Sequence, residues 1–159
     1  MAAQPLDLYR GTVQREWIDY NGHMNLAYYI LAFDHATDFM FDRLGIGGTY
    51  VRSTGCSVFA AETHVLYERE LKEGDPLRVT SQLIDADAKR LHLFHAMFHG
   101  TAGFRAATIE ILALHVDLSG PRSIPFADEP RRRIDALLEE HRALPRPPEL
   151  GRVIGIRRR

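Results

Sequence analysis

The feature that most constrains the fold is one long apolar pattern of helical period, followed by four strand-like runs. Over residues 26–44, apolar side chains recur at three- and four-residue steps, and much of the opposite side of the same helix is also apolar. A helix that is apolar on most sides is buried among other elements. Asn25 is suited to cap its first turn, and Gly45 to follow its last turn. The pattern therefore predicts a buried helix of about five turns.

Four runs with the period-two alternation of β-strands come after this helix, and short turns separate them. The runs cover residues 57–71, 77–86, 90–98 and 104–116. Such spacing is typical of consecutive strands joined by hairpins. Residues 8–17, ahead of the helix, are also compatible with a strand. One long helix with about five strands predicts an α+β domain with a mostly antiparallel sheet.

The remaining segments predict a short extension of a single domain. Residues 46–55 are rich in Gly, Ser and Thr and are expected to form a loop. Residues 128–142 have the pattern of an amphipathic helix, and the Pro- and Arg-rich residues 144–159 are expected to be extended or mobile. Because 159 residues suit one ordinary domain, we expect a core domain over residues 1–126 and a C-terminal helix and tail over residues 127–159.

Charge, cysteine content and motif content argue against several classes of function. The formal net charge is −1, so the chain has no basic field for nucleic acid. No apolar run approaches the ~18 residues of a membrane span, and the N-terminus lacks the pattern of a signal peptide. The single cysteine, Cys56, fits a reducing compartment, and HExxH, P-loop and GxGxxG motifs are absent. We therefore expect a cytoplasmic protein with no nucleic-acid or membrane partner, no metal and no other cofactor.

A dense group of polar residues precedes the predicted helix, in the stretch EWIDYNGHMN. Asp19, Asn21 and Gly22 are ordinary turn residues, and Asn25 is an ordinary N-cap, so a structural turn explains most of the group. A turn does not require an imidazole, however, and His23 is not explained in this way.

The position of these residues also suits acyl transfer. The N-terminus of a buried helix presents free N–H groups and the positive end of the helix dipole, which favour the oxyanion formed when a thioester or ester carbonyl is attacked. A carboxylate just before the helix, such as Asp19, can act as a nucleophile or as a general base for water. Gly22 lets the backbone approach a substrate closely. These residues predict a hydrolytic site in which His23 either assists water or only packs.

The order Asp-x-x-Gly-His-x-Asn that starts at Asp19, followed by an aromatic-rich helix ending in Leu-Gly, resembles the hotdog-fold acyl-CoA thioesterases of the 4-hydroxybenzoyl-CoA thioesterase type. The stretch YERELKEGD at residues 67–75 is similar to the same family, and the resemblance covers residues 8–118. It implies an antiparallel sheet wrapped around one long helix. It also implies that Asp19 is the catalytic carboxylate and that backbone N–H groups near Gly22 and His23 hold the thioester oxygen.

Two groups of residues are candidates for contact with the substrate: a group of aromatic residues around this motif and two basic residues at a turn. The aromatic residues form either core packing or a cage for a quaternary ammonium group, and the basic pair either meets CoA phosphates or is solvated. Three stretches are similar in sequence to the family branch associated with carnitine breakdown: EWIDYNGHMN, AETHVLYERELKEGDPL and KRLHLFHAMFH. This resemblance implies betainyl-CoA as the substrate. The aromatic group is Trp17, Tyr20, Tyr28, Tyr29, Phe33 and Phe59; the expected substrate-binding residues are Trp17, Tyr20, Asn21, Gly22, Asn25, Tyr28, Tyr29, Lys89 and Arg90.

Glu62 and His64 are two residues apart in a predicted strand, so both point to one face. They are either solvated or brought by a dimer interface to the partner's Asp19, since the resembled sites lie between protomers. The two exposed edges of the predicted sheet also favour two copies joined edge to edge. We therefore expect a homodimer or a dimer of dimers.

Three histidines, His92, His95 and His99, would share one face of a helix, as in a metal site. Their run alternates like a strand, which places His92 opposite to the other two, so no metal site is expected. The sequence predicts an acyl-CoA thioesterase. Two alternatives are a hotdog hydratase or dehydratase of enoyl thioesters that uses Glu62 and His64 as its acid–base pair, and a non-catalytic acyl-CoA-binding module.

Overall fold

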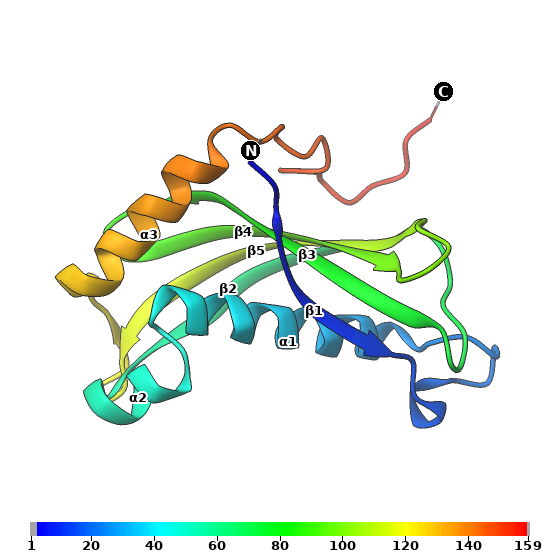
Figure 1. The fold of residues 1–159 in the computed structure, drawn as a ribbon, viewed down its shortest axis with the longest axis horizontal. Coiled ribbons are helices and arrows are strands. Elements are labelled where there is room, and N and C mark those ends of the chain that lie inside the picture. Colours follow the sequence, from blue (N-terminus) through cyan, green and yellow to red (C-terminus); the bar gives the residue numbers. More distant parts are fainter. Residues whose placement is uncertain (1–2, 159) are drawn as a thin grey trace.

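The predicted helix is α1, Leu26–Leu44, and it lies against one face of a curved antiparallel sheet in the computed structural model, which describes residues 3–158 (Figure 1). The Asn25 side chain accepts a hydrogen bond from the Ala27 N–H group at 3.0 Å, which caps the first turn. Gly45 takes a left-handed conformation, with φ 73°, that ends the helix. Both expected helix boundaries are confirmed.

Only one side of α1 is buried within the protomer. Leu26, Ile30 and Phe39, on the outward side, keep 59%, 40% and 50% of their surface exposed. The expectation that the helix is buried on most sides is therefore wrong for a single protomer, because the sheet covers one side alone. The buried residues of the helix are Tyr29, Ala32, Phe33, Ala36, Thr37, Met40 and Leu44.

Five long strands form the sheet in the order β1-β3-β4-β5-β2, and every neighbouring pair is antiparallel. The expected α+β architecture is confirmed. The strands are β1 Leu6–Thr12, β2 Cys56–Tyr67, β3 Pro76–Ala86, β4 Arg90–His99 and β5 Arg105–Asp117, and the two-residue β6, Arg122–Ser123, pairs with β5.

The expected hairpin between the first two runs after α1 is wrong. β2 pairs with β5 at one edge of the sheet, whereas β3 lies between β1 and β4. The connection passes the start of α1 instead of turning back: Leu71 is fully buried, and its N–H group donates to the Tyr29 hydroxyl at 3.0 Å. The strand expected over residues 8–17 also ends early, at Thr12, and Arg15–Trp17 forms the short 3-10 helix η1.

The predicted loop after α1 contains a helix instead, α2, Gly48–Thr54. The hydroxyl groups of Ser53 and Thr54 donate to the Tyr50 carbonyl oxygen at 3.1 and 2.7 Å. The Tyr50 hydroxyl lies 2.9 Å from Nε2 of His115 on β5. Packing of this tyrosine against the sheet therefore outweighs the weak helix propensity of the segment.

The C-terminal helix is α3, Asp128–His141, as expected. It covers the part of β3 that extends beyond β1, where the Leu83 N–H group donates to Nδ1 of His141 at 2.9 Å. The tail after α3, which was expected to be extended or mobile, instead contains a turn at residues 148–151. It crosses the sheet on the face opposite to α1 (Figure 1), which we call the outer face; the α1 side is the inner face. The Gly151 N–H group donates to Glu110 of β5 at 2.8 Å. None of the helices within residues 3–158 has the length and apolarity needed to cross a membrane.

His95 forms a fully buried polar contact between α1 and the sheet. Its Nε2 lies 3.0 Å from the Thr37 hydroxyl, which itself donates to the Phe33 carbonyl oxygen. The Nε2 atom therefore carries the proton, and Nδ1 accepts from the Ser81 hydroxyl at 2.7 Å. Burial lowers the pKa of His95 to about 4, so the ring is neutral at pH 7. His92 points to the outer face, which confirms that it lies opposite to His95.

Candidate active site

The polar stretch before α1 forms a tight turn that is anchored to the connection between β2 and β3. Ile18 and Met24 form an isolated β-bridge across it. Gly22, at φ 77°, donates its N–H group to the Asp19 carbonyl oxygen at 2.9 Å, and this left-handed conformation explains why a glycine is needed. The Met24 N–H group donates to the Leu71 carbonyl oxygen at 2.8 Å. The expected turn is confirmed.

The same turn orients the Asp19 carboxylate beside the start of α1. Its Oδ1 accepts from the Asn21 backbone N–H group at 2.8 Å, and its Oδ2 accepts from the Asn25 side-chain amide at 3.2 Å. Asn25 thus caps the helix and holds Asp19 with one side chain. Asp19 is half-buried, and each oxygen keeps a lone pair, so the carboxylate can take a proton from water or attack a carbonyl carbon.

The backbone N–H groups around the start of α1 differ in their availability. That of Gly22 is already bonded, and those of Ala27 and Tyr28 donate to the cap residue. Within residues 3–158, no acceptor is bonded to the N–H groups of His23 and Leu26. These two groups, with the positive end of the α1 dipole, form the available donor set for an oxyanion.

The His23 imidazole points toward Glu70 rather than forming a hydrogen bond with Asp19. Its Nε2 lies 3.9 Å from the Glu70 carboxylate, and both side chains are substantially exposed. This contact is long, so the described residues hold His23 loosely in place.

The aromatic residues near the motif separate into different environments. Trp17 and Tyr28 stack face to face, with ring centroids 5.5 Å apart and planes 11° apart, and they flank the turn. One protomer therefore contains no cage built from the whole group. Of the other members, Tyr29 and Phe33 are buried in the core, whereas Tyr20 and Phe59 are exposed.

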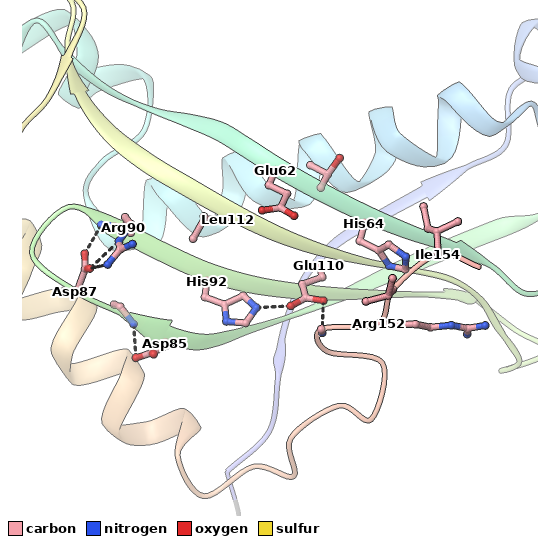
Figure 2. A pocket seen from close by; sticks show the side chains of 14 residues that line it. Glu62, His64, Asp85, Asp87, Arg90, His92, Glu110, Leu112, Arg152 and Ile154 are labelled. Atoms are coloured by element: carbon pink, nitrogen blue, oxygen red, sulfur yellow. Dashed lines mark hydrogen bonds and ion pairs between the residues drawn. The ribbon is translucent and has the colours of Figure 1, made fainter. Parts of the chain in front are cut away.

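Glu62 and His64 share a face of β2, as expected, and that face is the outer one (Figure 2). They line a cavity of about 770 Å³ whose far side is closed by the tail. His64 pairs in register with Glu110, whose Oε1 lies 2.7 Å from Nε2 of His92. Because the outer face is turned away from α1, one protomer does not bring either residue to Asp19.

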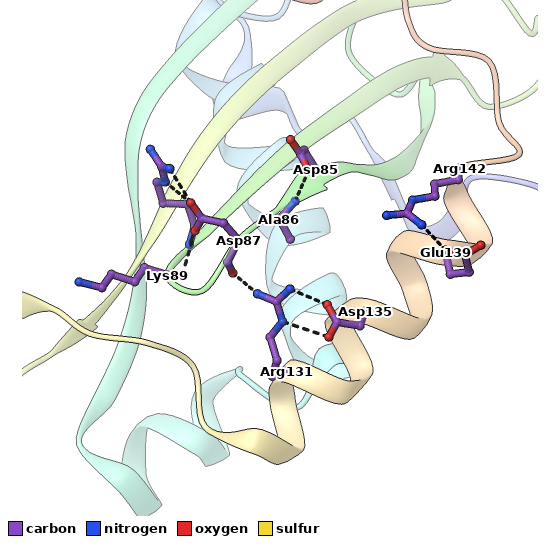
Figure 3. Close-up of polar contacts among 9 residues, drawn as sticks. Asp85, Ala86, Asp87, Lys89, Arg131, Asp135, Glu139 and Arg142 are labelled. Atoms are coloured by element: carbon purple, nitrogen blue, oxygen red, sulfur yellow. Dashed lines mark hydrogen bonds and ion pairs between the residues drawn. The ribbon is translucent and has the colours of Figure 1, made fainter.

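Lys89 lies in the turn between β3 and β4 (Figure 3), and Arg90 is the first residue of β4. Asp87 Oδ1 accepts from the backbone N–H groups of both, at 2.9 and 2.8 Å, and Asp87 Oδ2 accepts from Nε of Arg90 at 2.7 Å. The hydrogen bond from Arg90 is the main reason why the pKa of Asp87 is lowered to about 2. Arg90 is therefore committed to the turn, whereas the Lys89 side chain extends away from it (Figure 3).

A second cavity, of about 310 Å³, lies on the inner face between α1, α2, β2 and β5, and we call it the inner pocket. Its walls are mostly apolar and include Phe33, Phe41 and Ile111. Asp34 and Asp38, both from α1, are its only charged lining residues within the described part of the chain. These two residues were not predicted as site residues, because residues 46–55 were expected to form a loop rather than the helix α2. The available signal was a pair of acids four residues apart in an otherwise apolar helix.

A family comparison agrees with this arrangement. The model of the thioesterase-like superfamily matches residues 13–151, which include the Asp19 turn, α1 and strands β2 to β5. The chain belongs to the thioesterase-like superfamily. The match covers both the Asp19 turn and the inner pocket of the thioesterase.

Two curated relatives of this thioesterase share a substrate name. A betainyl-CoA thioesterase of Pseudomonas aeruginosa is 44% identical over 154 residues, which cover 97% of each chain. An L-carnitine dehydrogenase/betainyl-CoA thioesterase of Rhizobium meliloti is 34% identical over 157 residues, which cover 99% of this chain and 32% of that protein.

Solved structures resemble the thioesterase over nearly its whole length. A hypothetical protein of Staphylococcus aureus in complex with CoA has a TM-score of 0.89 and 29% identity, covering 99% of this chain and 98% of that one. A putative thioesterase of Pseudomonas putida has a TM-score of 0.83 and 34% identity, covering 98% and 99%. These comparisons confirm the expected hotdog fold, the family and the class of thioester hydrolase.

Proposed function

We propose that this thioesterase acts in the cytoplasm and hydrolyses betainyl-CoA to betaine and CoA. The observation that carries the proposal is the 44% identity with the Pseudomonas aeruginosa betainyl-CoA thioesterase over 97% of both chains. The structural relative that holds CoA supports a CoA thioester as the substrate. The lone Cys56 fits the reducing conditions of the cytoplasm.

Asp19 carries the chemistry by one of two routes. As a general base it takes a proton from water, and the hydroxide adds to the thioester carbon. As a nucleophile it adds to that carbon itself, and water then hydrolyses the acyl–aspartyl anhydride. In both routes the C–S bond breaks and CoA leaves as its thiolate.

The oxyanion formed by either attack is stabilised at the start of α1. The N–H groups of His23 and Leu26 are the available donors, and the helix dipole adds a positive potential there. Asn25 keeps the Asp19 carboxylate beside these donors through its 3.2 Å hydrogen bond. The stacked rings of Trp17 and Tyr28 flank the turn.

The site is completed by a second copy of the chain. β2 is a twelve-residue strand at an edge of the sheet. At one end, the Tyr67 hydroxyl donates to the Leu26 carbonyl oxygen at the start of α1 at 3.3 Å. At the other end, Ser57 and Val58 line the inner pocket. Antiparallel pairing of two β2 edges about a two-fold axis would set the first end of one strand against the second end of the other. Asp19 of one protomer would then face the inner pocket of its partner.

The proposed reaction is tested by free-thiol release from a panel of CoA esters: betainyl, short aliphatic, long aliphatic and aromatic. The proposal expects the highest kcat/KM for betainyl-CoA. Release that is highest for an aromatic or long aliphatic ester would contradict the substrate assignment. Hydration of an enoyl-CoA without thiol release would indicate the dehydratase, and tight CoA-ester binding without any turnover would indicate a binding module.

A further inference from the structure

We propose that the inner pocket binds the cationic end of the acyl group and that Asp34 and Asp38 select for it. The inference rests on the proposed function, because the cation in question is the trimethylammonium group of the betainyl thioester. It adds the residues that distinguish this acyl group from neutral ones of the same shape.

The lining of the pocket has the chemistry of a cation site. Most of its surface is apolar, and its only charged residues among the described ones are the two aspartates. Neither aspartate takes part in any of the ion pairs formed within residues 3–158. A ligand pocket with apolar walls and a few charged groups of one sign favours a ligand that has an apolar surface and a charge of the opposite sign.

The two negative charges lie close together on α1, and the neighbouring His35 offsets only part of them. Asp34 and Asp38 are four residues apart on α1, a spacing at which like charges repel. Burial, and then the charge of Asp34, raises the pKa of Asp38 above its usual value; His35 opposes this increase and Asp42 adds to it. A bound cation would offset this repulsion, so the pocket gains more from a positive ligand than from a neutral one.

A quaternary ammonium group suits the pocket better than a primary one. Three methyl groups spread its charge over an apolar surface, and it has no N–H donors that need acceptors. The apolar walls include Phe33 and Phe41, and aromatic rings attract such a cation where it lies over their faces. A primary ammonium would leave N–H groups against those walls at a cost in desolvation.

The pocket that serves Asp19 belongs to the partner. In the betainyl group the nitrogen is two bonds from the thioester carbon, so the Asp19 site and the cation site must adjoin. Within one protomer Asp19 precedes Leu26, and Asp38 lies twelve residues farther along α1, about 18 Å at 1.5 Å per residue. The antiparallel β2 pairing of the proposed dimer instead brings the Asp19 turn of one copy to the pocket of the other.

The test compares betainyl-CoA with 3,3-dimethylbutanoyl-CoA, in which a carbon replaces the nitrogen and the shape is kept. Wild type, Asp34→Asn and Asp38→Asn are assayed by thiol release on both esters. We expect each substitution to lower kcat/KM for betainyl-CoA by about tenfold, mainly through KM, as a lost charge contact of moderate strength would. Activity on the neutral ester should stay within about twofold of wild type, which also shows that each variant is folded.

Two controls make the outcome decisive. Asp42→Asn removes the third charge of the same helical row without lining the pocket, and should keep the wild-type preference. Asp38→Glu keeps the charge and should retain most of the preference. Variants whose ratio of betainyl to neutral activity equals that of wild type would overturn the inference and leave the thioesterase standing. A wild-type enzyme that does not hydrolyse betainyl-CoA would instead overturn the proposed function.

Discussion

Asn25 caps α1 and orients Asp19 with the same side chain. Its Oδ1 accepts from the Ala27 N–H group at 3.0 Å, and its Nδ2 donates to Asp19 Oδ2 at 3.2 Å. The stability of the helix start and the position of the proposed catalytic carboxylate are therefore coupled through one amide.

Two substitutions at Asn25 separate these roles. Serine still caps a helix but is too short to reach Asp19, so Asn25→Ser should lower kcat about tenfold with a melting temperature within about 2 °C of wild type. Asn25→Ala removes the cap as well and should cost about 1 kcal/mol of stability in addition. Steady-state kinetics and thermal melts measure the two effects. A serine variant with wild-type kcat would show that Asp19 needs no such support.

His95 makes the stability of the fold sensitive to acid. Its pKa is lowered to about 4 in the folded protein and is about 6.5 in the unfolded chain, so the unfolded state binds more protons between these values. The stabilisation is complete above pH 6.5 and is lost as the pH falls toward 4, by about 3 kcal/mol for this one group.

Urea unfolding at pH 7 and pH 4.5 checks this effect in wild type and in His95→Gln, which cannot titrate. The variant should be less stable at pH 7, because Thr37 and Ser81 lose a buried partner. It should also lose less stability on acidification than wild type does. An equal loss in both proteins would assign the acid sensitivity to other groups, such as His141, whose pKa burial also lowers.

A mixed dimer tests whether the site is shared between two copies. Asp19→Asn carries an intact pocket, and the double variant Asp34→Asn, Asp38→Asn carries an intact Asp19. If the sites are composite, each mixed dimer has one intact site, and an equal mixture regains about a quarter of wild-type activity at low betainyl-CoA. Activity equal to the mean of the two parents would place Asp19 and the pocket that it uses in the same protomer.

The entry to α2 offers a separate test of the inner pocket. A Cβ atom at Gly47 would lie 1.9 Å from Asp42 Oδ1, so Gly47→Ala must displace that side chain or the start of α2. We expect a loss of about 1–3 kcal/mol in urea unfolding, together with weaker binding of betainyl-CoA. The matched control is Gly120→Ala, where no atom lies within 4 Å of the added carbon and stability should change by less than about 0.5 kcal/mol. Equal stability of the two variants would contradict the tight packing at Gly47.

The sequence was sufficient for those parts of the fold that depend on local periodicity. α1 is marked by apolar spacing and by its cap and glycine, and each strand by alternation. The partner of β2 was not predictable in this way, because it depends on the contact of Leu71 with Tyr29, forty-two residues away in the chain. α2 was missed because its stability comes from the packing of Tyr50 on the sheet rather than from its composition.

The candidate site likewise combines features that follow from the local sequence with features that depend on tertiary contacts. The turn around Asp19 was predictable, because Gly22 and Asn25 have local roles in the backbone. Alternation showed that Glu62 and His64 share a face, but the choice between the inner and outer face follows from which side α1 covers. Asp34 and Asp38, both exposed in the protomer, become a pair of pocket residues only because α2 and β2 form other walls of the cavity.

The role of Asp19 is tested most directly by thiol release from betainyl-CoA by wild type, by Asp19→Asn and by Asp128→Asn, an exposed control on α3. Because the asparagine side chain can neither accept the proton from water nor attack the thioester, kcat/KM of Asp19→Asn should fall by about 10²-fold or more. The control should keep the wild-type rate. An Asp19→Asn enzyme that releases CoA as fast as wild type would show that another group performs the hydrolysis.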